Sequence, residues 1–130
     1  MERRAVNPVT WSVERGFIGE LVSGHTRALY CSGQTTMSGD GNLQYDGDMA
    51  AQLALSLDYP EAVLGEAGMV LVHLVRLNVH TADADLLFPQ YGVLTSRLRA
   101  AGVAAATTML GVTQPAIPGQ RVELEGSAVA

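Results

Sequence analysis

Strict alternation between apolar and polar side chains marks the end of the chain, over residues 122–129. The apolar set is Val122, Leu124 and Ala128, and the polar set is Glu123, Glu125 and Ser127. Because successive side chains of a β-strand point to opposite faces, this segment predicts a strand with one face on a core and one polar face. A fold that contains it must cover one side of a sheet with other elements.

A second strand is predicted just upstream, at residues 107–112. The connection between the two strands, residues 113–121, holds two prolines and a glycine, which cannot continue a ladder of hydrogen bonds. If the two strands pair as neighbours, Thr107 and Met109 lie on the same face as Glu123. We therefore predict a closing hairpin that gathers these three side chains.

A first helix is predicted from its apolar stripe. The stripe consists of Leu53, Leu57, Leu64 and Ala67. Asp46 or Asp48 is suited to cap its beginning, and Gly68 is suited to end it. Pro60 lies inside the stripe, where it removes a backbone hydrogen bond at a cost of about 3 kcal/mol, so we predict a kink or break there.

The remaining segments predict further strands and a second helix. Strands are predicted at residues 4–6, 19–23, 28–32 and 70–79. The second and third of these form a predicted hairpin around a turn at residues 24–26. The second helix is predicted over residues 86–101, with Asp83 or Asp85 as its cap. Its apolar stripe consists of Leu87, Tyr91, Leu94 and Leu98.

The order of these elements predicts one domain over residues 1–130, with two helices that can cover only one face of a sheet. Hydrophobic residues make up 48% of the chain and charged residues 16%, which is more apolar surface than a small monomer readily hides. We therefore expect an oligomer. Neither observation distinguishes a dimer from a trimer.

Charge and residue usage exclude several classes of function. The net charge is −5 and the arginines do not cluster, so nucleic acid is not expected as a partner. The chain has no lysine, which excludes Schiff-base catalysis by a lysine and a Walker-type phosphate site. Cys31 is the only cysteine, and no apolar run approaches the roughly 20 residues of a membrane helix. We expect a cytoplasmic protein without a membrane partner.

No metal or cofactor is expected either. His73 and His80 are seven residues apart on one predicted strand, an odd offset that points them to opposite faces. The chain shows no zinc-ligand spacing, no glycine-rich phosphate loop and no serine-triad signature.

Several segments together resemble one protein family. In chain order they are Tyr30–Gln34, Asp48–Gly68, Leu74–Val79, Leu110–Val112, Ile117–Gly119 and Val122–Glu125. The last three are similar to the C-terminal signature of the RidA/YjgF reactive-intermediate deaminases, and the resemblance covers nearly the whole chain from about Phe17. It implies an α+β, chorismate-mutase-like sheet of about six strands with two helices on one face. It also implies a homotrimeric barrel with small-molecule clefts between subunits.

The resemblance further implies which residues form the site. Glu123 occupies the place of a glutamate thought to hold the water that attacks an imine carbon. Thr107 stands where active deaminases carry an arginine that clamps the substrate carboxylate. Met109 falls where the family often has a cysteine, and Phe17 lies close to the place of an aromatic residue that covers the cleft.

Three further residues have two interpretations each. Ser32 and Gly33 match a Ser-Gly segment whose backbone lines the family's cleft, but they equally suit a tight strand end. Tyr91 suits a proton donor in the cleft or a position in the helix core.

Two functions of different class follow. The first is an enzyme that hydrolyses or tautomerises a small imine or enamine in a cleft between subunits, with Glu123 and an ordered water and without a cofactor. The second is a non-catalytic trimeric module that holds a metabolite or a protein partner. Thr107, in place of the arginine clamp, favours this second interpretation.

Overall fold

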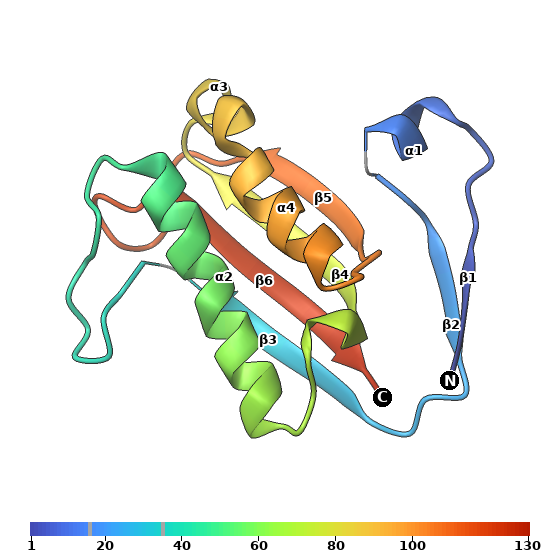
Figure 1. The fold of residues 1–130 in the computed structure, drawn as a ribbon. Helices are drawn as coiled ribbons and strands as arrows, with labels where there is room; N and C mark the ends of the chain where they lie inside the picture. The colour runs from blue at the N-terminus through green and yellow to red at the C-terminus, as the bar shows by residue number, and fades with distance from the viewer. Residues whose placement is uncertain (16, 35) are drawn as a thin grey trace.

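The computed structural model describes residues 1–15, 17–34 and 36–130 and shows an α+β fold (Figure 1). Its strands are β1 (Glu2–Ala5), β2 (Glu20–Ser23), β3 (Ala28–Gln34), β4 (Leu74–Thr81), β5 (Ala106–Gly111) and β6 (Val122–Val129). Its helices are α1 (Trp11–Glu14), α2 (Met49–Glu66), α3 (Ala84–Leu87) and α4 (Gly92–Ala100), with 3₁₀ turns at Leu71–His73 and Phe88–Gln90. The described strands number six, as predicted, but they form two sheets, one of order β1-β2 and one of order β3-β6-β4-β5.

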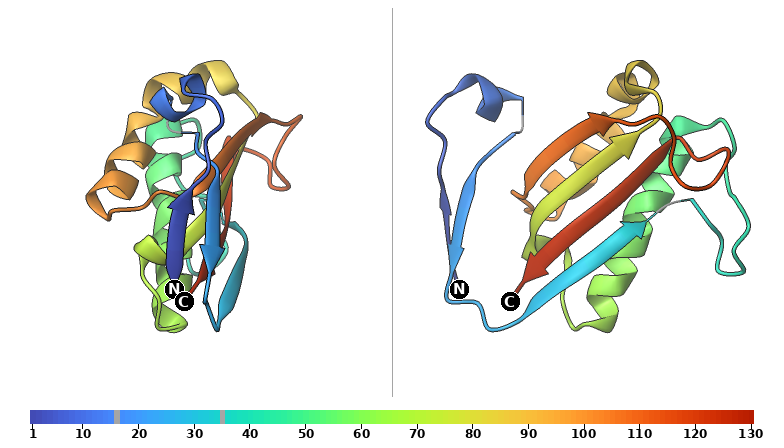
Figure 2. Two further views of the ribbon diagram at one scale, coloured as in Figure 1. Left: turned by 90° about the vertical axis from the view of Figure 1, so that its right-hand side faces the viewer. Right: turned by 180° about the vertical axis from the view of Figure 1, so that it is seen from behind.

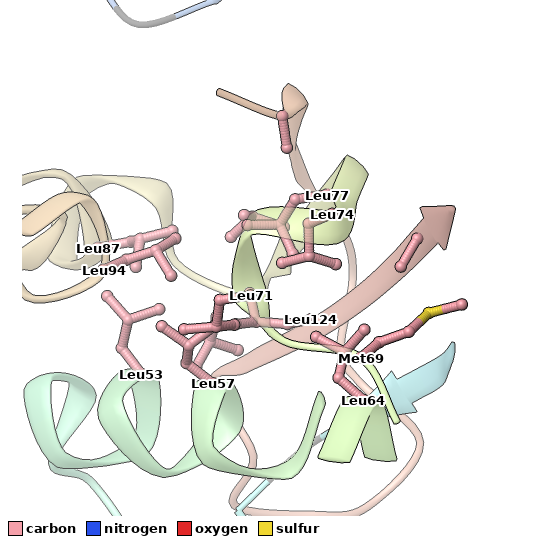
Figure 3. Close-up of a cluster of buried hydrophobic side chains, with 14 of the residues drawn as sticks. Leu53, Leu57, Leu64, Met69, Leu71, Leu74, Leu77, Leu87, Leu94 and Leu124 are labelled. Atoms are coloured by element: carbon pink, nitrogen blue, oxygen red, sulfur yellow. The ribbon is translucent and has the colours of Figure 1, made fainter. Parts of the chain in front are cut away.

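Helices α2 and α4 lie on the same face of the four-stranded sheet, and the opposite face is bare in both views (Figure 2). Leucines fill the space between the two layers (Figure 3). Those with no more than 1% of their surface exposed are Leu53, Leu57, Leu64, Leu74, Leu77, Leu87, Leu94 and Leu124. The predicted one-sided helix packing is confirmed, and the apolar face of β6 contributes to this core as its alternation required.

Helix α2 begins where the sequence placed it. The Asp48 carboxylate caps it by accepting a hydrogen bond of 3.0 Å from the Ala51 amide, and Gly68 follows its end with a φ of +68°. The helix is continuous from Met49 to Glu66, so the predicted break at Pro60 is wrong. Pro60 is buried, and the apolar surface that its ring removes from water offsets the missing hydrogen bond.

The second predicted helix is divided into α3, a 3₁₀ turn and α4. Asp83 caps α3 by accepting a hydrogen bond of 2.9 Å from the Leu86 amide. Pro89 lies in the 3₁₀ turn and has no N–H to donate, which explains why one regular helix does not extend through it. The division matters because α3 and α4 together form the crossover that a parallel pair such as β4 and β5 needs.

Both predicted hairpins are wrong. β2 pairs with β1 and not with β3, and β4 lies between β5 and β6. The small β1-β2 sheet is held by Arg3, whose guanidinium bonds to the Glu20 carboxylate at 2.6 and 3.0 Å and to the Leu74 carbonyl at 2.8 Å. β4 and β6 are the two inner strands of this sheet, and both carry a buried face, as expected because the middle of a sheet buries the most surface.

Strand register decides which side chains share a face. Thr107 pairs with Leu77, and Met109 pairs with Val79, both of which are buried beneath the helices. Glu123 instead pairs with His80 on the bare face. The prediction that Thr107 and Met109 share a face with Glu123 is therefore wrong. The odd-numbered and the even-numbered residues of 107–112 each combine a threonine with apolar residues. Hydrophobicity therefore could not decide which of the two sets faces the core.

Among the described residues, none of the helices has both the length and the apolar character needed to cross a bilayer.

Candidate functional site

The bare face of the four-stranded sheet carries a band of polar side chains. It is defined here as the open-face cluster and consists of Arg76, Asn78 and His80 from β4, Thr108 from β5, and Glu123 and Glu125 from β6. These residues share a face because they occupy alternate positions on adjacent strands. The covered face of the same strands forms the core, so the polar side chains lie on one face of the sheet and the packed apolar side chains on the other.

Glu123 lies directly against the backbone of β3. A Cβ placed on Gly33 would overlap the Glu123 carboxylate, so any other residue at position 33 would push this carboxylate away from the place it occupies. The pairing of β3 with β6 shifts register between Cys31 and Gln34, and this irregularity brings Gly33 to the carboxylate. Gly33 and Glu123 are thus brought together, as expected from the resemblance.

The Glu123 carboxylate borders a pocket of about 260 Å³ at the end of the sheet. The lining residues are Gly33, His80, Val112, Gln114, Pro115, Ala116, Glu123 and Glu125. One wall is the loop between β5 and β6, and the other is formed by the ends of β3, β4 and β6. The pocket therefore combines two carboxylates and an imidazole with a partly apolar wall.

Glu125 is held by its neighbours on β4. Its Oε1 atom accepts a hydrogen bond of 2.8 Å from Asn78 Nδ2 and lies 3.4 Å from His80 Nε2. These hydrogen bonds, first that from Asn78 and then that from His80, lower the pKa of Glu125 below its ordinary value. Glu125 therefore stays ionised at neutral pH and keeps its neighbours oriented.

A positive charge lies on the same face. The Arg76 guanidinium donates a hydrogen bond of 2.6 Å to the Thr108 hydroxyl, and Arg76 lies two residues before Asn78 on β4, on the same face. Arg76, Asn78 and His80 are not among the site residues predicted from the sequence. The sequence signal for them is the spacing of polar side chains at every second residue of β4, which matches the spacing of Glu123 and Glu125 in β6.

The other residues named from the resemblance lie elsewhere. Thr107 and Tyr91 line a separate cavity behind β5, and Met109 packs against the core. Phe17 is half-buried, and its amide donates to the Ser12 carbonyl at 2.8 Å. Ser32 is exposed on β3 beside Gly33. Within one chain, then, only the Ser32–Gly33 segment accompanies Glu123.

In the part of the chain that the structure describes, no three His, Cys, Asp or Glu side chains are arranged to hold a metal ion.

Comparisons with known proteins agree with this architecture. The family model described as Endoribonuclease L-PSP matches residues 19–130. The crystal structure of YyfB from Yersinia pestis, a protein of unknown function of the conserved Rid protein family, is 28% identical, with all of both chains covered and a TM-score of 0.82. Rv2704 from Mycobacterium tuberculosis, a member of the YjgF/YER057c/UK114 family, is 26% identical over 99% of this chain and 100% of its own, with a TM-score of 0.64.

A third structure supports the fold alone. Escherichia coli TdcF with bound serine is 19% identical over 85% of this chain and 84% of its own, with a TM-score of 0.71. No match was found among the curated proteins.

Proposed function

This chain belongs to the Rid/YjgF family, and from that membership and the geometry around Glu123 we propose that it is a cofactor-free hydrolase of small imines or enamines. The observation that carries the proposal is the Glu123 carboxylate, which lies over the Gly33 backbone at the mouth of a pocket. An ionisable group that borders a pocket can hold a water molecule and take its proton.

The proposed reaction needs one water and no redox step. Glu123 accepts a proton from the water molecule while the water oxygen bonds to the imine carbon. The proton then passes from Glu123 to the imine nitrogen. The hydroxyl proton of the resulting carbinolamine then passes to its nitrogen as the carbon–nitrogen bond breaks, which gives a carbonyl compound and ammonia. An enamine enters the same sequence after it tautomerises to the imine.

Arg76 is our candidate for binding the anionic end of an acidic substrate. The family's arginine position holds Thr107, which lies on the covered face. Arg76 comes from the neighbouring strand and is on the same open face as Glu123. Arg76 pairs with Ser127, four residues along β6 from Glu123, which is about 13 Å of strand, and it does not line the pocket. A guanidinium can form two parallel hydrogen bonds with a carboxylate, so Arg76 suits an acidic substrate long enough to span that distance.

We propose that three chains assemble with their bare sheet faces inward, which would close the Glu123 pocket from solvent. Two apolar side chains on strands of that sheet are unusually exposed in the single chain: Tyr30, with 78% of its surface accessible, and Leu110, with 52%. Burial of such side chains between subunits would stabilise an oligomer.

The mass of the protein in solution tests this assembly. Light scattering coupled to size exclusion is expected to give three times the 13.7 kDa of one chain. Tyr30→Arg should shift the protein toward monomer, because it places three like charges in the shared interior. Glu66→Arg is the matched control, since Glu66 is exposed at the end of α2 on the helix side. A monomeric parent protein would refute the assembly.

The activity itself is tested with a freshly generated imine. An amino-acid oxidase acting on alanine produces 2-iminopropanoate, and semicarbazide traps the imine that has not been hydrolysed. We expect the protein to lower the yield of the trapped product in proportion to its concentration, because enzymatic hydrolysis competes with trapping. An unchanged yield at stoichiometric protein would exclude this substrate. Imines of arylalkyl amines, which lack the carboxylate, would then be the next substrates to test.

A second candidate is a non-catalytic binding or regulatory module. It is favoured by one observation: none of the described residues that line the Glu123 pocket is an arginine. In this case a small metabolite would bind on the open face and stay unchanged. Saturable binding of an amino acid or keto acid without any imine turnover would support the module over the enzyme.

The name of the matching family model also raises ribonuclease activity. The Glu123 pocket has two carboxylates, and the chain carries thirteen acidic residues against eight basic ones. This charge repels a phosphate backbone, so we do not propose RNA as the substrate.

A further inference from the structure

His80 lies in the wall of the Glu123 pocket, on the strand next to Glu123. The two residues are direct partners in the antiparallel pairing of β4 with β6, and both line the pocket. Side chains directly opposite each other on one face have Cβ atoms about 4.5–5.5 Å apart, so one small molecule can touch both. The His80 side chain keeps 29% of its surface exposed, and its ring is therefore accessible to a molecule that enters the pocket.

The imidazole ring is held by a chain of two hydrogen bonds. Asn78 Nδ2 donates to Glu125 Oε1 at 2.8 Å, and His80 Nε2 lies 3.4 Å from the same oxygen. An ionised carboxylate can only accept hydrogen bonds, so the Nε2 atom that faces it carries the proton. The other ring nitrogen, Nδ1, is then the basic one, and no group among the described residues bonds to it. Nδ1 is therefore free to accept a proton from a bound molecule.

The remaining walls around His80 contribute no titratable group within the described residues. On β5 its partner is Leu110, and the β5–β6 loop contributes the uncharged residues 114–116. On β3 the lining residue is Gly33. Arg76 is on the same strand, four residues away, which is about 13 Å. Besides the two glutamates of β6, the imidazole is thus the one proton carrier that the described lining of this pocket offers.

Imine hydrolysis contains a proton transfer that needs such a carrier. After water has added to the imine carbon, the hydroxyl proton of the carbinolamine must reach the nitrogen on the same carbon. A direct transfer between these two atoms passes through a strained four-membered ring. A side chain that accepts the proton and releases it again avoids that ring, and an imidazole can do both near neutral pH.

We propose that His80 is a second catalytic residue of the Glu123 pocket and carries the hydroxyl proton of the carbinolamine to its nitrogen. Nδ1 accepts the proton from the hydroxyl group and then releases it to the amino nitrogen. The carbon–nitrogen bond breaks, its electron pair leaves with ammonia, and the carbonyl double bond forms. The imidazole ends in its starting state, so the step consumes no further reactant. This inference rests on the imine hydrolysis proposed above.

His80→Gln tests this proton transfer. The glutamine amide can still donate a hydrogen bond to Glu125, but it cannot accept and release a proton at neutral pH. We expect the rate of imine hydrolysis to fall by about 10²-fold, the lower end of the range for acid–base catalysis, because water carries the same proton less efficiently. His25→Gln is the matched control, since His25 is exposed in the turn between β2 and β3, at the far end of β3 from Gly33. Its rate should equal that of the parent protein.

Rescue by free imidazole separates a chemical role of His80 from a structural one. His80→Ala leaves a space that is open to the pocket and to solvent, so added imidazole can enter it. We expect imidazole to raise the rate of this variant by roughly tenfold, with saturation, after subtraction of its effect in samples without protein. The parent protein and His25→Ala should gain nothing beyond that background. All variants should keep the parent's mass in light scattering.

The possible results distinguish the role of His80 from the hydrolysis itself. An active parent protein whose rate is unchanged in His80→Gln refutes the role of His80 and leaves that of Glu123 intact. A slow His80→Ala variant that imidazole does not rescue also refutes it, because the side chain then acts only through the fold. A parent protein that hydrolyses neither 2-iminopropanoate nor an arylalkyl imine refutes the proposed function, and the role of His80 with it.

Discussion

Glu123→Gln is expected to lower the rate of imine hydrolysis by about 10² to 10⁴, the contribution typical of a positioned general base. Glutamine has nearly the same shape as glutamate, so it fits over Gly33 with little strain. Its amide cannot take a proton from water at neutral pH, however. The change therefore removes the proton acceptor while it preserves the packing of β6 against β3. The variant is compared with the parent protein in the semicarbazide competition assay.

Glu66→Gln is the matched control for this prediction. It makes the same chemical change at an exposed carboxylate on the last residue of α2, which lies on the helix side of the sheet. Its rate should equal that of the parent protein. Both variants should also keep the parent's mass in light scattering. If Glu123→Gln hydrolyses the imine at the parental rate, Glu123 is not the general base and the proposed mechanism fails.

Gln52→Met is expected to destabilise the fold by roughly 2–5 kcal/mol, because it leaves buried backbone groups without partners. The Gln52 side chain is fully buried and makes three hydrogen bonds to the backbone. Its Nε2 atom donates to the carbonyls of Tyr45 at 3.0 Å and Gly119 at 3.1 Å, and its Oε1 atom accepts from the Arg121 amide at 2.8 Å. Methionine fills a similar volume but satisfies none of these groups.

These hydrogen bonds link α2 to the loop that precedes it, which contains Tyr45, and to the β5–β6 connection, part of which lines the Glu123 pocket. Tyr45 has a φ of +55°, a conformation that costs free energy in a residue other than glycine, and Gln52 helps to hold it. The loss should appear as a lower urea midpoint at fixed protein concentration. Gln44→Met is the control, since its two side-chain hydrogen bonds are long, at 3.3 and 3.4 Å, and local. Equal midpoints for the two variants would show that the Gln52 contacts contribute little.

Much of the secondary structure could be predicted from side-chain pattern. Alternation over residues 122–129 predicted β6 and its two faces, and the cap at Asp48 predicted the start of α2. These predictions succeed because they depend on local geometry, in which a strand repeats every two residues and a helix every 3.6. The position of Glu123 on the polar face of β6 follows from the same rule.

The pairing of strands could not be predicted in this way. Adjacent strands in the sequence were assumed to form hairpins, but β4 enters between β5 and β6, and β2 pairs with β1. The consequence for the site is large, because Thr107 and Met109 lie on the covered face while Arg76 lies on the open one. The odd-numbered and the even-numbered residues of 107–112 are similarly apolar, so only the register with β4 decides which of them point to the covered face.

By itself, then, the sequence determined the identity of most elements, the polar face of the last strand and the family resemblance, since each depends on residues close together in the chain. Only the tertiary structure decided which strands are neighbours, which side chains join Glu123 on the open face, and that a second cavity lies between the N-terminal arm and β5. Those features depend on contacts between distant residues, and such contacts are selected by total buried surface and hydrogen bonding over the whole sheet.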